Sequence, residues 1–513
     1  MNLRAMLLQA AERNPDRVSV VEKSNYLTYG ELATAAMRLA DSLVSLGVGH
    51  GDRVAMSMRN STEFVVSFCA TQMMGAVATP FNFRLKADTI NHILNNSGAK
   101  ALIFDDALDP QELESAVSQH PDLILIQSNG PASPRRYALP DLCTSGQRVV
   151  HHTIDRNDLS CIIYTSGTTG LPKGVPLTHR SNYARLITFL MTTGPKFDAN
   201  GKTFGAAPLY HTVGLHWVLM QTLFTNGTYY PIQKITSEVV RYMLDEGIDF
   251  LFGSPTLIRQ ILREMDRPAE KMRYVCYGSA PTDQSLLDAM TASFPNAQIS
   301  EVYGTTESSI PFVTPSMAGR KPGTLRTTGD FRVRLIKPAG APDEEVGPGE
   351  FGELIVHTEN AGIFERYWGE NGDRKAAEKM RDGWLYSGDI LTRDEQGNYF
   401  FSGRYDDTFV SGGENINPVE IENILHLHPS IEDVAVVGLP DPEWSNVVTA
   451  FVVLGDTTAK EEDLDRYCRE SSLENFKRPR CYHFVDALPR NPSGKLLRKN
   501  LRELAQNLQK TGA

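Results

Sequence analysis

The residues best suited to chemistry lie in one short segment, 164–174, which reads Tyr-Thr-Ser-Gly-Thr-Thr-Gly-Leu-Pro-Lys-Gly. Its glycines let backbone N–H groups approach an anion, its hydroxyl groups donate hydrogen bonds to phosphate oxygens, and its lysine adds a positive charge. The segment follows an apolar run, 160–163, that is typical of a buried strand. Because the order of residues in a Walker A loop is missing, we expect a phosphate-binding loop of another kind; a polar surface loop is the alternative.

Alternating helical and strand patterns surround this loop in the first half of the chain. They predict α/β layers with largely parallel sheets. The expected helices are 29–46 and 62–74. The expected strands are 53–58, 100–104, 123–127, 249–252, 274–277 and 298–301. From about residue 328, short strands and glycine-rich turns predict a β-rich subdomain over 328–405.

The C-terminal part, 406–513, has the pattern of a separate α+β unit. Asn417 has the type of an N-cap residue, a proline follows at the first helical position, and Glu420 stands where a capping box places its acid. A helix over 419–427 is expected after this cap. We therefore predict a large multi-layer N-terminal α/β domain over 1–405, followed by a small, mobile α+β C-terminal domain.

Composition and charge exclude several classes of protein. The chain has 513 residues and a formal charge of −11, and an acidic surface is a poor match for the phosphates of nucleic acids. Six scattered cysteines without metal-type spacing are typical of reduced core thiols. The apolar stretch 64–83 contains Gln72 and Pro80, which favour a buried helix and strand over a membrane span. We expect a cytoplasmic protein without a membrane span or a nucleic-acid partner.

The segment 164–174 resembles the signature of the adenylate-forming superfamily, which includes acyl-CoA synthetases, peptide-synthetase adenylation domains and luciferases. Four further segments match this superfamily in the same order along the chain: Tyr-Gly-Thr-Thr-Glu at 303–307, Tyr-Ser-Gly-Asp at 386–389, Gly-Arg-Tyr-Asp-Asp at 403–407 and Asn-Pro-Ser-Gly-Lys at 491–495. Five matching segments in one order are far more specific than any one of them. The chain is therefore identified as a member over essentially its whole length.

The resemblance implies a site for ATP and Mg²⁺, and the residue types suit it. The ring of Tyr303 can stack on adenine, and the carboxylate of Glu307 can coordinate Mg²⁺. Asp389 can accept hydrogen bonds from ribose hydroxyls with Arg404 beside it; a turn role after Gly388 is the alternative. The implied residues for ATP or AMP are Thr165, Ser166, Gly167, Thr168, Thr169, Gly170, Lys173, Gly278, Ser279, Ala280, Tyr303, Gly304, Thr305, Thr306, Asp389 and Arg404, with Thr168 and Glu307 at Mg²⁺.

A reaction in two steps follows from the same resemblance. The carboxylate of an acid attacks the α-phosphate of ATP and displaces pyrophosphate, and a thiol then attacks the acyl-adenylate and releases AMP. Lys495 would stabilise the charge that builds on the α-phosphate in the first step. The small domain would then rotate about a hinge at Asp406. As bare residues, Lys495 would be a solvated cation and Asp406 an exposed turn acid.

Within the superfamily, the chain is similar to aryl-CoA ligases of the 4-chlorobenzoate:CoA ligase type. The shared segments are 84–86, 208–214, 411–422 and 476–479. In that type, cations hold the phosphates of coenzyme A and aromatic rings flank its nucleotide, which the residue types here allow. The implied CoA-binding residues are Arg84, Gly412, Gly413, Trp444, Phe476 and Arg478.

His211 matches the residue that borders the acid's carboxylate, although a lone histidine in an apolar run is more often a core residue. Together with Glu307 and Lys495, it completes the expected catalytic set. The implied wall of the acid pocket includes no lysine or arginine, so we expect an aromatic or medium-sized apolar acid. Thr188 stands where the aryl-CoA ligase pattern has phenylalanine, which leaves aromaticity open. The wall comprises His211, Thr212, Val213, Phe252, Gly253 and Ser308.

Transfer to CoA is the expected second step, and transfer to a separate carrier protein or luciferase-like oxidation are the alternatives. A carrier-loading enzyme would lose the roles given to Arg84, Arg478 and Trp444. A non-catalytic nucleotide sensor would need a broken catalytic set, whereas Glu307 and Lys495 are both present. We expect an ATP-dependent, AMP-forming acid:CoA ligase that acts on small molecules as a monomer or homodimer.

Overall fold

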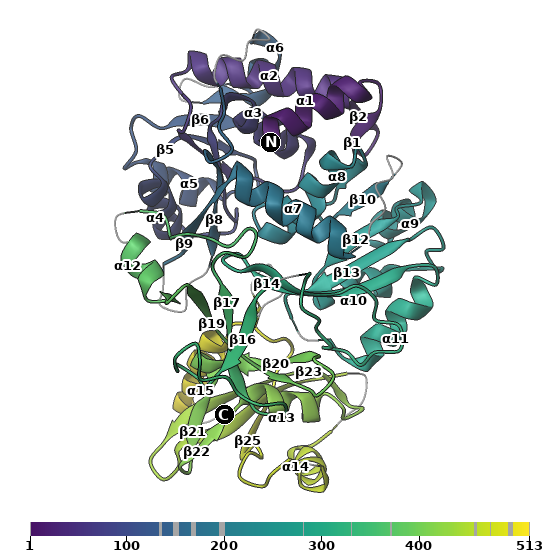
Figure 1. Ribbon diagram of the computed structural model, residues 1–513, viewed down its shortest axis with the longest axis vertical. Coiled ribbons are helices and arrows are strands. Elements are labelled where there is room, and N and C mark those ends of the chain that lie inside the picture. Colours follow the sequence, from purple (N-terminus) through teal and green to yellow (C-terminus); the bar gives the residue numbers. More distant parts are fainter. Residues whose placement is uncertain are drawn as a thin grey trace.

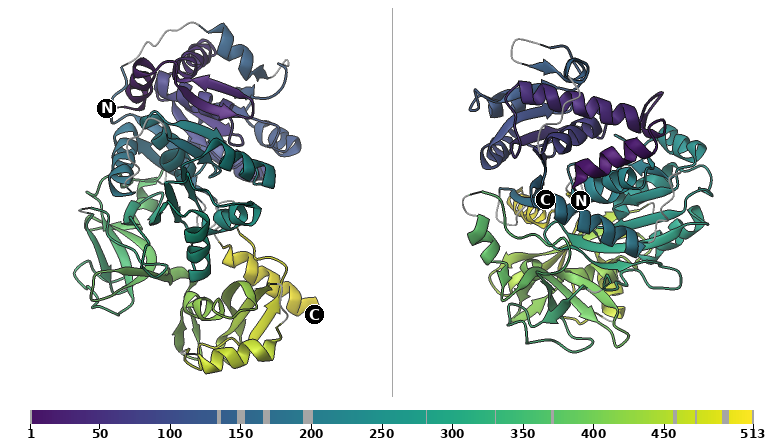
Figure 2. Two further views of the ribbon diagram at one scale, coloured as in Figure 1. Left: turned by 90° about the vertical axis from the view of Figure 1, so that its right-hand side faces the viewer. Right: turned by 45° about the horizontal axis from the view of Figure 1, so that its top comes forward.

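The computed structural model describes residues 2–132, 136–146, 153–165, 171–193, 201–280, 282–329, 331–369, 372–455, 459–471, 473–490 and 496–511. The architecture is mixed α/β, with a large N-terminal part and a smaller C-terminal part (Figure 1). The first helices and the C-terminal unit lie at opposite ends of the long axis, as the side view in Figure 2 also shows.

The first of two large N-terminal sheets has its parallel strands in the middle and an antiparallel pair at each edge. Its central strands at 250–253 and 274–278 are buried along almost their whole length, which explains why the runs 250–252 and 274–277 are continuously apolar. In spatial order, its strands within the described residues are β15 (Ser309–Thr314), β14 (Gln298–Thr305), β13 (Tyr274–Gly278), β12 (Phe250–Gly253), β10 (Lys202–Gly205), β11 (Thr228–Pro231), β1 (Val18–Glu22) and β2 (Asn25–Thr28).

The second large sheet is parallel except for the hairpin of β8 and β9, whose turn contains most of the segment 164–174. Strands β4 and β8 are neighbours here although they lie far apart in the sequence. Over the described residues, the order is β7 (Tyr137–Ala138), β6 (Ile124–Gln127), β5 (Ala99–Phe104), β3 (Arg53–Ser57), β4 (Val77–Pro80), β8 (Leu159–Thr165) and β9 (Lys173–Thr178).

Helices cover these sheets. They are α1 (Leu3–Arg13), α2 (Tyr29–Ser45), α3 (Thr62–Met74), α4 (Ala87–Ser97), α5 (Pro110–Val117), α6 (Leu139–Ser145), α7 (His179–Thr193), the π-helix η1 (Val213–Met220), α8 (Gln221–Phe224), α9 (Ser237–Glu246), α10 (Pro255–Glu264) and α11 (Gln284–Ser293). Helix α7 contacts β8 and β9 of one sheet, β15 of the other, and η1. Figure 1 shows it in the middle of the N-terminal part, where it can position residues from both sheets.

Helix α3 illustrates how the sequence specifies these elements. Ser61 caps its first turn by accepting a hydrogen bond from the Phe64 N–H group, and Gly75 ends it in the left-handed conformation. The helix is apolar around its whole circumference, so it can be stable only where it is fully buried. The residues from Phe64 to Met74 are all buried, and β4 follows, as expected for the stretch 64–83.

After β15 the chain forms the antiparallel, β-rich part that the glycine-rich pattern predicted. Its elements are β16 (Val333–Ile336), β17 (Gly352–His357), α12 (Gly372–Ala377), β18 (Met380–Arg381), β19 (Trp384–Arg393) and β20 (Tyr399–Arg404). The register of β19 and β20 places Asp389 opposite Arg404. This pairing brings two of the predicted site residues together.

The C-terminal unit has its own apolar core, formed by residues such as Ile421, Val436 and Leu464. Its elements are the 3₁₀ turn η2 (Tyr405–Asp407), β21 (Phe409–Ser411), β22 (Glu414–Ile416), α13 (Pro418–Leu425), β23 (Ile431–Asp441), β24 (Ser445–Leu454), α14 (Glu461–Glu470), β25 (Cys481–Phe484) and α15 (Arg498–Thr511). This core shares no residue with the N-terminal cores.

One local expectation was wrong. Asn417 does cap α13, but it accepts from the Val419 N–H group at 3.1 Å, and the predicted capping box does not form. The carboxylate of Glu420 instead binds the Lys477 ammonium at 2.8 and 2.9 Å. A charged partner from a distant segment competes successfully with the local backbone group. In the described ranges, no helix combines the length and apolarity needed to cross a bilayer.

Candidate active site

The hairpin of β8 and β9 brings together the two ends of the predicted phosphate loop. Thr165 and Lys173 lie opposite each other, and Thr165 Oγ1 donates to the Lys173 carbonyl oxygen at 3.4 Å. The Lys173 ammonium lies 5.2 Å from the ring centroid of Tyr367. The remaining predicted loop residues, Ser166, Gly167, Thr168, Thr169 and Gly170, lie outside the described residues. The described ends thus direct the lysine towards Tyr367, which the sequence analysis did not single out.

Tyr367 also holds Glu307, the predicted Mg²⁺ ligand. Its hydroxyl donates to Glu307 Oε1 at 2.8 Å, and the Phe364 N–H group donates to the Glu307 carbonyl oxygen at 2.9 Å. Burial and the neighbouring carboxylate raise the pKa of Tyr367 above its usual value, so the hydroxyl stays protonated and donates. No motif near 367 signals this contact, because it depends on the tertiary fold.

A single carboxylate of this kind fits Mg²⁺ that arrives with a nucleotide. Mg²⁺ is usually bound through one or two carboxylates together with substrate phosphates, and it keeps several waters. The described residues include no cluster of three or more His, Cys, Asp and Glu side chains that could hold a metal by itself. The donor set around Glu307 therefore suits a metal that shares its ligands with phosphate oxygens.

Asp389 is the centre of a buried cluster that joins β14, β19 and β20. It is 4% exposed, its Oδ1 accepts from Arg404 Nη1 at 2.8 Å, and its Oδ2 accepts from the Tyr303 hydroxyl. Burial alone would lower the pKa of Arg404, but Asp389 raises it; burial and the same carboxylate raise the pKa of Tyr303. The ring of Tyr303 lies beside those of Phe312 and Phe401, at centroid distances of 5.6 and 6.1 Å. Three predicted nucleotide-binding residues thus form one unit.

Thr306 connects this unit to the element that carries His211. Its Oγ1 lies 2.9 Å from Oγ1 of Thr212, which directly precedes η1. The ring of His211 lies 4.8 Å from that of Tyr210, and its Nε2 is buried without a hydrogen-bond partner among the described residues. Burial lowers the pKa of His211 to about 4, so the imidazole is neutral near pH 7. The imidazole therefore carries no charge, and its Nε2 could still form a hydrogen bond.

Close backbone approach shapes the edge where β12, β13 and β14 end. A Cβ at Gly278 would lie 2.1 Å from the Val302 carbonyl oxygen, and one at Gly304 would lie 2.0 Å from the Ser309 carbonyl oxygen. Ser279 follows with a φ of 73°. The predicted residues Gly253, Gly278, Ser279, Ala280, Gly304 and Thr305 all lie at or beyond the carboxyl ends of these strands. Ligands of α/β folds bind at this edge.

The predicted wall of the acid pocket comes from the same edge and from η1. Thr212 directly precedes η1 and Val213 begins it. Phe252 belongs to β12, and its ring stacks on Phe189 of α7 at a centroid distance of 5.8 Å. The side chain of Ser308 is less available than expected, because its Oγ accepts from the Thr305 N–H group at 3.1 Å. Ser308 therefore closes a turn beside the site.

The predicted CoA-binding residues lie in two places. Arg84 lies over the ring of Phe83 at 5.2 Å, and Phe83 packs edge-on against Tyr210, the neighbour of His211. In the C-terminal unit, Gly412 donates its N–H group to the Trp444 carbonyl oxygen at 2.9 Å. Gly412 and Gly413 both have positive φ, and the ring of Trp444 leaves no space for a Cβ at Gly412. Trp444 and Phe476 are 44% and 42% exposed.

Arg478 is the exception among these residues. Its side chain is only 11% exposed and forms an ion pair with Asp465 of α14, which the sequence analysis did not anticipate. Asp465 also pairs with Arg469 at 2.7 Å. A phosphate that uses Arg478 must therefore compete with a carboxylate already in place.

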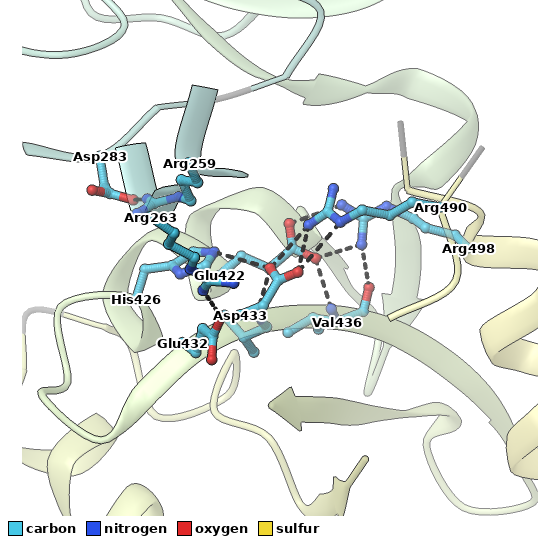
Figure 3. A network of polar contacts seen from close by, with 11 residues as sticks. Arg259, Arg263, Asp283, Glu422, His426, Glu432, Asp433, Val436, Arg490 and Arg498 are labelled. Atoms are coloured by element: carbon cyan, nitrogen blue, oxygen red, sulfur yellow. Dashed lines mark hydrogen bonds and ion pairs between the residues drawn. The ribbon is translucent and has the colours of Figure 1, made fainter. Parts of the chain in front are cut away.

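Lys495 lies outside the described residues, but both stems of its segment are described and anchored (Figure 3). Arg490 pairs with Asp433 at 2.8 Å. Arg498 donates to Glu422 Oε2 at 2.8 Å and to the Val436 carbonyl oxygen at 2.7 Å. Arg498 also pairs at 3.4 Å with Asp407, next to the exposed Asp406. Arg498 therefore connects the chain just after Lys495 to the predicted hinge segment.

Comparison with known proteins shows the family to which the chain belongs. Residues 7–368 match the model of the AMP-binding enzyme family, and residues 420–495 match the model of the AMP-binding enzyme C-terminal domain. The chain belongs to this family. It is 31% identical to 4-chlorobenzoate–CoA ligase of Arthrobacter sp (96% of this chain, 93% of the relative) and 32% identical to feruloyl-CoA synthase of Amycolatopsis sp (96% and 97%). Fatty acid–[acyl-carrier-protein] ligase ScoC of Streptomyces coeruleorubidus is 32% identical (96% and 94%).

The chain is accordingly an AMP-forming acid–thiol ligase of the adenylate-forming type. Among solved structures, ATP-bound MatB from Rhodopseudomonas palustris has a TM-score of 0.86 at 26% identity, covering 99% of this chain and 100% of that one. The apo structure of the same protein, at the same coverage, has a TM-score of 0.77. The overall arrangement of this chain is thus closer to the ATP-bound form.

Proposed function

We propose that the protein is an ATP-dependent, AMP-forming carboxylic acid:CoA ligase for an aromatic or medium-sized apolar acid. The cluster of Tyr303, Asp389 and Arg404 supports the binding of ATP. It combines an aromatic ring, a buried hydrogen-bond acceptor and a cation. Asp389 would accept the ribose hydroxyls and Tyr303 would lie against adenine. Lys173, with the loop before it, would bind the phosphates.

In the first step, an oxygen of the acid's carboxylate forms a bond to the α-phosphorus of ATP, and the bond to pyrophosphate breaks. Thr306 and Lys495 would stabilise the charge on the α-phosphate. Mg²⁺ held by Glu307 would supply charge neutralisation on the leaving pyrophosphate. His211, neutral because burial lowers its pKa to about 4, would border the acid's carboxylate without adding a charge of its own.

In the second step, the CoA thiol would attack the acyl carbon and AMP would leave. We propose that the parts 1–405 and 406–513 rotate against each other about Asp406 between the steps. Two observations support this: the C-terminal unit has a separate core, and the 3₁₀ turn η2 joins the parts. Arg84, Gly412, Gly413, Trp444, Phe476 and Arg478 would then bind CoA.

The proposed acid class follows from the pocket wall. Thr212, Val213, Phe252 and Gly253 add no charge, so a second carboxylate on the acid would be left unpaired, which is costly. The stacked rings of Phe189 and Phe252 make one side of this wall flat and apolar. The names of two relatives, which refer to 4-chlorobenzoate and to feruloyl-CoA, support an aromatic acid.

Loading of a carrier protein is the second candidate, and two observations favour it. The relative ScoC is named as an acyl-carrier-protein ligase, and Arg478 is paired with Asp465 instead of being free for CoA. The test supplies ATP, Mg²⁺ and an accepted acid together with either CoA or a phosphopantetheinylated carrier protein, and identifies the thioester by mass spectrometry. Formation of acyl-CoA supports the proposal, and acylation of the carrier protein alone would replace it.

We also propose that the enzyme works in the cytoplasm. All six cysteines are described, and none forms a disulfide; burial raises the pKa of Cys69 and Cys143 to about 12. Thiols of this kind stay reduced and unreactive and fit a reducing compartment. Localisation of a fluorescent fusion tests this, and a signal confined to the cell envelope would contradict it.

A further inference from the structure

Among the described residues, the largest fully buried side chain is that of Arg185 on α7. Within the described residues, its Nη1 is buried without a hydrogen-bond partner, although a buried charge is costly unless it is paired. Burial lowers the pKa of Arg185 only to about 10, so the side chain keeps its charge at neutral pH. A buried cation of this kind needs a function that compensates for its cost.

Its hydrogen bonds connect two segments of the proposed site. Nη2 donates to the Thr306 carbonyl oxygen at 2.7 Å, and Nε donates to the Gly362 carbonyl oxygen at 2.7 Å. Thr306 precedes Glu307, and Gly362 begins the segment whose Phe364 N–H group and Tyr367 hydroxyl both bind Glu307. Arg185 therefore links, through hydrogen bonds, the two backbone segments that hold the proposed Mg²⁺ ligand.

Gly362 is shaped for this contact. Its φ is +79°, and a Cβ at this position would lie 2.5 Å from Arg185 Cγ, closer than any real contact. A side chain at 362 would thus both strain the backbone and displace Arg185. Position 362 requires glycine because the side chain of Arg185 lies directly against its backbone.

Helix α7 is itself held in one orientation by a buried polar chain. Asn182, one turn before Arg185, accepts at 2.7 Å from Nε2 of His216 in η1 and donates to Ser160 Oγ of β8 at 3.0 Å. Burial and the nearby guanidinium of Arg185 lower the pKa of His216 to about 3, so this imidazole is neutral. Strand β8, α7 and η1 are thereby linked in a fixed register. Arg185 is held at a defined position relative to both sheets.

We propose that Arg185 is a positioning residue for the Mg²⁺-dependent adenylation step: it holds the Thr306–Glu307 turn against the segment from Gly362 to Tyr367 and places a fixed positive charge beside Glu307. This inference rests on the proposed function, because it assigns Arg185 to the same site. Arg185 acts through Glu307 and Thr306 and contacts no substrate. Pyrophosphate would leave before the thiol reacts, so the second step would need Glu307 less than the first.

The test compares Arg185→Met, which removes the charge and both bonds at similar length, with Arg185→Lys, which keeps the charge. Arg180→Met is the matched control, because Arg180 is an exposed arginine on the same helix. Loss of hydrogen bonds from a charged group predicts a fall of about 10- to 100-fold in the adenylation rate for Arg185→Met. We expect partial recovery in Arg185→Lys and no change in the control. Thioester formation from supplied acyl-adenylate should stay within about 3-fold of wild type, since that step would not use the metal at Glu307.

Gly362→Ala provides a second variant that leaves the charge in the protein but displaces Arg185, and it should show the same selective loss. Equal losses in both half-reactions, or an unchanged adenylation rate in Arg185→Met, would overturn the proposal. A binding measurement separates this outcome from failure of the proposed function. Calorimetric titration of ATP with and without Mg²⁺ should show that Mg²⁺ strengthens binding less in Arg185→Met than in wild type. A wild type that binds MgATP but adenylates no acid would refute the proposed function, while this comparison would still decide the role of Arg185.

Discussion

The buried carboxyl group of Glu301, close in sequence to Tyr303 of the proposed nucleotide site, should make the stability of the protein depend on pH. Glu301 lies on β14, two residues before Tyr303, and is 6% exposed. Its Oε2 accepts from the Tyr277 hydroxyl and from the Gly323 N–H group, each at 2.9 Å. Burial outweighs these two hydrogen bonds and raises the pKa of Glu301 from 4.5 to about 7.

The sign of the effect follows from where the proton is bound. Between pH 4.5 and about 7 the folded state holds a proton on Glu301 that the unfolded state releases, so folding is favoured at low pH. This contribution is complete below 4.5 and is lost as the pH rises through 7. A rise from 4.5 to about 7 corresponds to about 3 kcal/mol of unfolding free energy.

Glu301→Gln should therefore stabilise the protein above pH 8 by up to about 3 kcal/mol and change it little near pH 5. The amide oxygen can still accept from Tyr277 and Gly323, but the ionised form is removed. Thermal unfolding of the ligand-free protein near pH 5 and pH 8.5 measures this, and Glu270→Gln, at an exposed carboxylate, is the control. A variant that gains nothing at the higher pH, or that is destabilised equally at both, would refute the reasoning.

Three further predictions concern catalysis. Lys495→Ala should abolish adenylate formation and leave thioester formation from supplied acyl-adenylate largely intact. Rapid-quench assays measure the rate of each half-reaction. Equal losses in the two rates would contradict a rotation of the small domain between the steps. Asp465→Asn frees Arg478 from its carboxylate, so the KM for CoA should fall about 3- to 10-fold while the adenylation rate is unchanged. Arg478→Ala should raise the same KM. A higher KM for CoA in Asp465→Asn would contradict competition between Asp465 and a CoA phosphate for Arg478. Because burial lowers the pKa of His211 to about 4, pH–rate profiles of wild type and His211→Gln should have the same shape between about pH 5.5 and 8; a limb near pH 6.5 that only wild type shows would contradict a neutral His211.

The local patterns of the sequence predicted most of the elements well. Helix α3 matches its predicted range because a serine cap, an apolar run and a glycine stop all act within a few residues. Strand β14 extends to Thr305, beyond the predicted end at residue 301. Its last residues pair with β15, and that partner cannot be read from the strand's own pattern.

The candidate site divides in the same way. The segments with Tyr303, Asp389 and Arg404 could be found because their residue types and order are distinctive, and the structure brings these three into contact. Tyr367 and Arg185 could not be found, because their role comes from distant partners. No spacing rule relates an arginine on α7 to the carbonyl groups of Thr306 and Gly362.

The central claim is that this protein activates a carboxylic acid with ATP and transfers it to CoA. The most direct measurement is pyrophosphate release from ATP and Mg²⁺ over a panel of benzoates, cinnamates and medium-chain aliphatic acids, with and without CoA. We predict that at least one aromatic or medium-sized apolar acid supports turnover that continues only when CoA is added. Release that CoA does not accelerate would contradict CoA as the acceptor, and no release with any acid would contradict the proposed activity.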